Sequence, residues 1–81
     1  MENIHGLSTA IATVVRKLRD KAGLTQSAFA DFAGLSHVYI AQLETEARGA
    51  SLTALILIGR AVGLKGADVF ALVERELEKH E

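Results

Sequence analysis

The chain of 81 residues contains no cysteine, no proline and no tryptophan. Without cysteine it can form no disulfide, no thiolate metal site and no thiol nucleophile. Without proline no helix is forced to break, and the abundant alanine and leucine favour helices. No alternation of β-branched and aromatic residues is long enough for a sheet. We therefore expect an all-α fold.

Long hydrophobic runs are also missing. The longest, residues 52–64, is interrupted by a threonine, two glycines and an arginine, and it is too short to span a bilayer. The first seven residues lack the basic region and apolar core of a signal peptide. We therefore expect a cytoplasmic protein with a single small domain over residues 1–81, its core spanning about 8–64.

Recognisable catalytic and metal-binding motifs are missing as well. His5, His37 and His80 lie far apart and share no metal-ligand spacing, and no glycine-rich phosphate loop is present. Serine, histidine and aspartate occur without any catalytic motif around them. The sequence predicts neither catalysis nor a metal, cofactor or small-molecule ligand.

A net charge of −1 does not by itself indicate nucleic-acid binding. The charges are, however, unevenly distributed. Residues 1–66 contain seven Lys and Arg against five Asp and Glu, whereas residues 67–81 contain two against five. If the chain binds a phosphate backbone, its acidic end must face away from it.

Apolar residues at helical spacing predict five helices. The first begins after Gly6, with Ser8 or Thr9 as its cap. Of the other four, the second follows Thr25, the third follows Ser36, the fourth follows Ser51 and the last runs over about 67–79, because Ser and Thr side chains accept backbone N–H groups at helix starts. The expected core-facing residues are, helix by helix, Ile11, Val14, Val15, Leu18 and Ala22; Phe29, Ala30, Phe32 and Ala33; Ile40, Leu43 and Ala47; Leu52, Leu55, Ile56, Gly59 and Val62; and Val69 and Leu72.

The second and third helices are joined by a tight turn at Gly34, the residue type that adopts a left-handed conformation without steric cost. This stretch resembles the helix-turn-helix of the Cro-type and XRE-type DNA-binding regulators, a lambda-repressor-like fold. The resemblance covers about Ile11 to Leu64 and rests on an ordered set of residues: Leu18-Arg19, Gly23-Leu24-Thr25-Gln26, Phe29-Ala30, Gly34-Leu35-Ser36, Ile40, Leu43-Glu44, Arg48 and Ser51-Leu52.

The resemblance implies a regulator that binds double-stranded DNA with its third helix in the major groove. The residues on that helix opposite Ile40 and Leu43 form one exposed face and correspond to the family's base-reading positions: His37, Val38, Ala41, Gln42 and Thr45. Contacts to phosphates are expected from Gln26, Ser27, Ser36, Tyr39 and Arg48. The family also implies a structural ion pair between Arg19 and Glu44, which holds the first helix to the third.

Two departures from the family pattern affect the details. Glu46 and Ala50 stand where a glycine and a proline are usual, so the third helix is free to run a turn longer. His37 stands where controller-like relatives carry an arginine, so their target sequence cannot be transferred.

The end of the chain resembles the dimerising end of controller proteins from restriction–modification systems, a branch of the same family. A chain of this size buries only about 60–65% of its unfolded surface, and docking onto a second copy would add to its core. We expect a homodimer on a palindromic operator, with Leu57, Phe70, Val73 and Leu77 at the interface. The alternative is an antitoxin or adaptor module, whose main partner is another protein.

Overall fold

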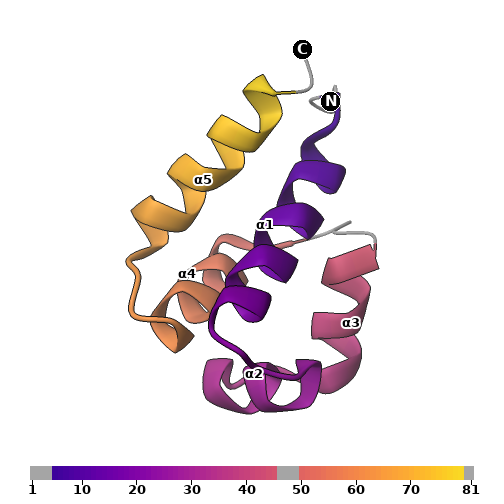
Figure 1. Cartoon of the computed structure of the whole chain (residues 1–81), viewed down its shortest axis with the longest axis vertical. Coiled ribbons are helices and arrows are strands. Elements are labelled where there is room, and N and C mark those ends of the chain that lie inside the picture. Colours follow the sequence, from indigo (N-terminus) through magenta and orange to yellow (C-terminus); the bar gives the residue numbers. More distant parts are fainter. Residues whose placement is uncertain (1–4, 46–49, 80–81) are drawn as a thin grey trace.

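The computed structural model describes residues 5–45 and 50–79, and this part of the chain contains five α-helices and no strand. The helices are α1 (Leu7–Lys21), α2 (Gln26–Ala33), α3 (His37–Thr45), α4 (Leu52–Ala61) and α5 (Gly66–Glu78). The all-α prediction is confirmed. In Figure 1, α1 runs down the middle with α5 on one side and α3 on the other, while α2 and α4 lie around its lower end. None of the described helices is long and apolar enough to cross a membrane.

Three of the predicted helix caps are present. The side-chain oxygens of Thr25, Ser36 and Ser51 accept the backbone N–H groups of Ala28 at 3.1 Å, Tyr39 at 3.1 Å and Ala54 at 3.0 Å. Each bond satisfies a donor that the first turn of a helix leaves without an intrahelical partner.

The predicted cap of α1 is wrong. This helix begins at Leu7, and its cap is Gly6 with φ 80°, which makes no side-chain hydrogen bond. The Gly6 carbonyl already accepts the Ala10 N–H at 2.9 Å. Ser8 and Thr9 therefore lie inside the first turn and are exposed.

The core surrounds α1, which packs against α3 on one side and α5 on the other. Its largest fully buried side chains come from all five helices: Val15, Phe29, Ile40, Leu43, Ile58 and Val69. Every helix therefore contributes to one shared core, and α3 packs on it mainly through α1 and α2.

The face that α4 turns inward differs from the prediction. Its buried residues are Ala54, Leu55, Ile58 and Gly59, whereas Leu52 is 69% exposed. Gly59 lies at one edge of this face, where a Cβ would lie only 2.9 Å from Val69 Cγ2 and 3.1 Å from the Leu64 carbonyl oxygen. Only a glycine allows α5 to pack this closely here. Leu52, the first residue of α4, lies about 90° around the helix from the midpoint of the buried face and is therefore exposed.

Phe32 was expected in the core and is 68% exposed. The buried residues of α2 are Phe29, Ala30 and Ala33. The midpoint of this face lies about 100° around the helix from Phe32, which therefore points into solvent.

Candidate nucleic-acid interface

The helices α2 and α3 are joined by a turn with a defined geometry. Gly34 ends α2 with φ 72°, and the Leu35 N–H then donates to the Ala30 carbonyl at 2.9 Å. Ala30 itself is fully buried where the helices pack, so its single methyl group sets their spacing. The turn and the Ser36 cap fix the direction in which α3 leaves.

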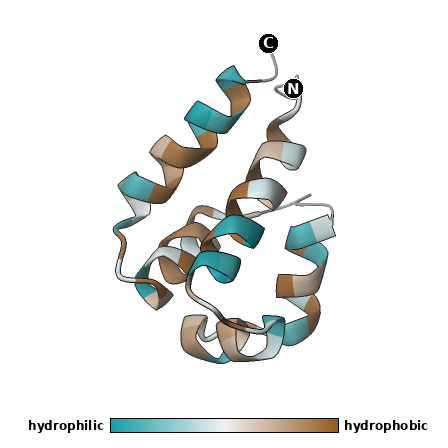
Figure 2. Cartoon of the chain, viewed as in Figure 1, coloured by the Kyte–Doolittle hydropathy of each residue, from teal (hydrophilic) through white to brown (hydrophobic). Residues whose placement is uncertain are grey.

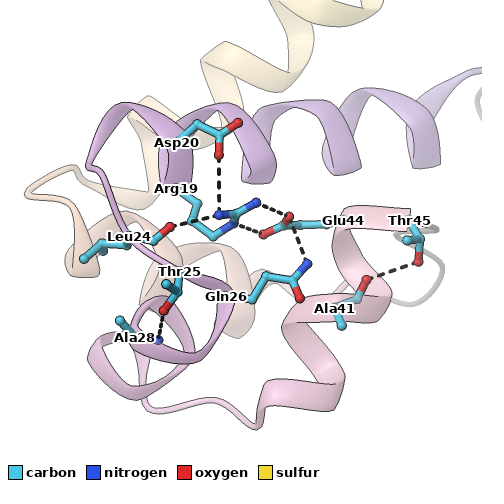
Figure 3. Close-up of polar contacts among 9 residues, drawn as sticks. All are labelled: Arg19, Asp20, Leu24, Thr25, Gln26, Ala28, Ala41, Glu44 and Thr45. Atoms are coloured by element: carbon cyan, nitrogen blue, oxygen red, sulfur yellow. Dashed lines mark hydrogen bonds and ion pairs between the residues drawn. The ribbon is translucent and has the colours of Figure 1, made fainter.

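A buried ion pair connects α1 to α3. Arg19 Nε donates to Glu44 Oε2 at 2.6 Å, and Arg19 Nη2 donates to Glu44 Oε1 at 2.9 Å. The two side chains are 17% and 3% exposed. These contacts are the ion pair that the family resemblance implies. Figure 3 shows the guanidinium and the carboxylate facing each other in this two-pronged geometry, which is the strongest that arginine forms with a carboxylate.

The pair is embedded in further hydrogen bonds. Arg19 Nη1 donates to the Leu24 carbonyl at 2.9 Å, and Gln26 Nε2 donates to Glu44 Oε1 at 3.2 Å. The hydrogen bond and charge of Glu44 raise the pKa of Arg19, although partial burial opposes the rise. Because Leu24 and Gln26 lie just before and at the start of α2, this network fixes three helices relative to one another (Figure 3).

The outer face of α3 carries the five predicted base-reading residues. Ile40 and Leu43 are buried beneath it. Opposite them His37, Val38, Gln42 and Thr45 are exposed and Ala41 is half-buried. Val38 is 66% exposed.

Two of these side chains have partners within the chain. The His37 ring nitrogen Nε2 lies 3.1 Å from Ser27 Oγ and 3.3 Å from Asp31 Oδ1, so the ring lies against α2. The Thr45 hydroxyl donates to the Ala41 carbonyl at 3.1 Å. Its oxygen still has a free lone pair, whereas the polar edge of His37 must turn outward to contact a base.

The predicted phosphate-binding residues lie in two places. Gln26 and Ser27 open α2, although Gln26 also bonds to Glu44. Ser36 and Tyr39 line a hollow of about 530 Å³ with Gly34, Leu35, Ser51, Thr53 and Ala54. The hollow collects the starts of α3 and α4, and its lining contains no acidic residue. Arg48, like Ala47 and Glu46, lies outside the described residues.

Ser51 and Thr53 line the same hollow as Ser36 and Tyr39 but were not among the predicted phosphate-binding residues. Ser51 was explained by its capping role, and nothing in the spacing of Thr53 marks it as a site. Only the fold brings α4 to the edge of the turn between α2 and α3. In the sequence these two residues could have been noticed only as a pair, because together they place two hydroxyl groups at the start of the helix that follows α3.

The four residues predicted at the dimer interface differ in burial. Phe70 is 52% exposed, but Val73 is 4% exposed and belongs to the core, which corrects its placement at an interface. The cause is that α5 packs against both α1 and α4, so its buried face is wider than one stripe. Leu57 is half-buried, and so is Leu77, which packs against the core.

Beside Phe70 lies a different set of apolar residues, of which Leu52 is exposed and Ile56 and Leu64 are half-buried. Leu52, Ile56, Leu64 and Phe70 line a hollow of about 620 Å³ between α4 and α5, with Arg60 and Lys65 at its edge. Two of the four large apolar residues that are most exposed in the described chain, Leu52 and Phe70, lie here. Figure 2 shows that most of the α4 ribbon has the colour of hydrophobic residues.

A helix-turn-helix family model matches residues 15–69, which is more than half of the chain and includes α2, α3 and α4. The chain therefore belongs to the helix-turn-helix family, a family of DNA-binding proteins rather than a class of enzymes.

Among solved structures the chain is similar to the restriction–modification controller protein C.Esp1396I. One wild-type structure of that protein is 27% identical, with a TM-score of 0.83 over 93% of this chain and 97% of the other. Another is 26% identical, with a TM-score of 0.81 over 98% and 100% of the two chains. No curated protein sequence matches. The predicted resemblance to the Cro-type and XRE-type family and to its controller branch is confirmed.

Proposed function

We propose that this protein is a transcriptional regulator that reads a specific double-stranded DNA sequence with α3 in the major groove. The observation that carries the proposal is the outer face of α3, which presents polar and apolar side chains to solvent. The opposite face of the same helix is fixed in place by the buried Ile40 and Leu43 and by the Arg19–Glu44 ion pair. A recognition helix must be held rigidly, because its discrimination between bases depends on hydrogen-bond geometry.

Each side chain of the face suits a different base edge. The Gln42 amide can pair with the N6 and N7 atoms of adenine, and a His37 nitrogen can donate to N7 or O6 of guanine. Val38 and Ala41 are placed to meet a thymine methyl group, and Thr45 can reach a base or the backbone. The face contains no arginine or lysine, so most of the attraction to phosphates must come from elsewhere.

Phosphate contacts would position α3 in the groove. Ser27 at the start of α2 and the hollow lined by Ser36, Tyr39, Ser51 and Thr53 offer hydroxyl groups and helix N-termini, both of which suit phosphate oxygens. Gln26 and Arg48 complete the predicted set. The absence of acidic residues from the lining of the hollow supports this use.

We also propose that two copies associate through the hollow between α4 and α5, centred on Leu52 and Phe70. Leu57 and Leu77, which were also predicted at the interface, do not line it. An exposed apolar patch of this kind marks an interaction surface. A two-fold dimer can bind a palindromic operator when its two recognition helices lie about 34 Å apart. C.Esp1396I is a restriction–modification controller protein, and we propose the same role for this chain. It would then act in the cytoplasm, together with the DNA that it binds.

The experiment is a selection of bound duplexes from a random pool, with the full chain as the bait. We expect a palindromic consensus whose half-sites are about one helical turn apart. Recovery of unenriched or non-palindromic duplexes would contradict the proposal.

The hollow between α4 and α5 also suits a different protein, as an antitoxin or adaptor would need. A stable complex with a second protein, purified together with the chain and required for its solubility, would favour that function. A DNA footprint from the chain alone would favour the regulator.

A further inference from the structure

A third hollow, of about 240 Å³, lies between α1 and α5. Its apolar floor consists of Val14, Leu18 and Leu72. In Figure 1, α1 stands between this side of the molecule and α3. The groove shares no residue with the proposed DNA-binding surface or with the proposed dimer surface, so neither function accounts for it.

Basic residues from both helices surround this floor. Lys17 and Lys21 are one turn apart on α1, and Arg75 and Lys79 are one turn apart on α5. Among the lining residues the carboxylate is that of Glu76, which lies 3.2 Å from Lys17 Nζ and 3.7 Å from Lys79 Nζ. The rim thus carries four cations against one carboxylate, in a chain whose net charge is −1.

The cations remain accessible although two of them contact Glu76. The Glu76 side chain is 9% exposed, whereas those of Lys17 and Lys79 are 62% and 57% exposed. Glu76 therefore holds the lysines at the edges of the groove from below. Lys21 and Arg75 are exposed as well. A ligand in the groove would meet apolar carbon in the middle and positive charge on both sides.

The size of the hollow limits what it can hold. It is smaller than the roughly 300–1,000 Å³ typical of sites for drug-sized ligands, but it can take one large apolar side chain. Phosphates of a nucleic acid would use the cations and leave the floor of Val14, Leu18 and Leu72 unused. A helix with one apolar anchor flanked by carboxylates would use both, in the manner of a helix bound in a groove.

We propose that the groove between α1 and α5 binds an acidic, amphipathic segment of another protein, with one apolar side chain on the floor and Asp or Glu side chains at Lys17, Lys21, Arg75 and Lys79. Because the groove and the outer face of α3 lie on opposite sides of α1, the chain can hold this segment while it is bound to DNA. The surface would thus link a bound operator to a second protein.

The test is a selection of random dodecapeptides displayed on phage against the full chain. Such a peptide spans about 18 Å as a helix, which is enough to cross the groove. We expect enriched peptides with one large apolar residue between acidic residues. Addition of the best peptide to ¹⁵N-labelled protein should shift the amides of Val14, Leu18 and Leu72, and prebound duplex DNA should leave its affinity unchanged.

Charge-reversed variants provide the control. Lys21→Glu combined with Arg75→Glu should weaken the selected peptide about tenfold or more, while Arg16→Glu, on the same helix but outside the groove, should leave it unchanged. Both variants change exposed residues only, and circular dichroism verifies their folding. Enrichment of neutral or basic peptides, no enrichment, displacement by DNA, or equal binding to the double variant would each overturn the proposal. So would tight binding of a peptide covering residues 67–81 of this chain, which would indicate self-association.

Discussion

Glu44 is the residue whose replacement should most damage the connection between α1 and α3. Its carboxylate accepts two hydrogen bonds from Arg19 and one from Gln26, and its side chain is 3% exposed. Glu44→Ala would leave the largely buried Arg19 guanidinium with only the exposed Asp20 carboxylate, 3.4 Å away, as an ion-pair partner. Removal of one member of a buried ion pair costs about 3–5 kcal/mol. Because Arg19 keeps its bond to the Leu24 carbonyl and is 17% exposed, we expect the lower end, about 3 kcal/mol.

That loss is large for a chain of this length. A domain of 81 residues is stable by roughly 4–12 kcal/mol, and each kcal/mol lost lowers the melting temperature by about 4–8 °C. We therefore expect Glu44→Ala to lower it by about 12–24 °C in a thermal scan followed by circular dichroism. Glu74→Ala, which removes an exposed carboxylate of α5, is the matched control and should change stability by no more than about 0.5 kcal/mol.

A double-mutant cycle separates the ion pair from the packing around it. Arg19→Met and Glu44→Ala each remove one partner and leave the other charge buried and unpaired. The double variant leaves neither charge, so it should lose clearly less free energy of unfolding than the sum of the two single variants. A wild-type melting temperature for Glu44→Ala, or fully additive effects of the two changes, would refute the reasoning.

Two further predictions concern packing and association. Gly59→Ala should destabilise the fold by about 1–3 kcal/mol in urea unfolding, since the new methyl group would overlap Val69 and the Leu64 carbonyl. Unchanged stability would show that the close contact of α4 with α5 does not require a glycine. Leu52→Ser combined with Phe70→Ser should convert a dimer to a monomer in sedimentation at micromolar concentration, whereas Phe32→Ser, equally exposed on α2, should not. Dissociation by the control variant alone would place the interface elsewhere.

The part of the fold that the sequence predicted rests on local signals. Thr25, Ser36 and Ser51 cap the helices that follow them because their hydroxyl groups reach backbone donors three residues on, a contact that needs no knowledge of the remaining chain. Gly34 ends α2 for an equally local reason. The Arg19–Glu44 pair joins residues 25 positions apart and was accessible only through the family resemblance.

The rotation of α4 and α5 could not be predicted in this way. Helix α4 is apolar almost all round, so helical spacing fits more than one inward face. The packing of α5 against α4 decides between them, and it exists only after α5 has folded back. The same packing buries Val73, which was predicted at the dimer interface, and leaves Leu52 exposed, which was predicted in the core. The placement of Ser51 and Thr53 at the hollow beside Ser36 and Tyr39, which we propose contacts phosphates, depends on that arrangement too.

The central claim, that the outer face of α3 reads bases, is tested most directly by the sequence preference of Gln42→Ala beside that of the wild-type protein. Selection of duplexes by both should show preference lost at one base pair of each half-site, with about 1–3 kcal/mol of discrimination removed there and the other positions unchanged. Arg48→Ala is the contrasting variant, which should weaken all sequences alike and reduce the salt dependence by about one phosphate per protomer. An unchanged preference for Gln42→Ala at every position would contradict the account.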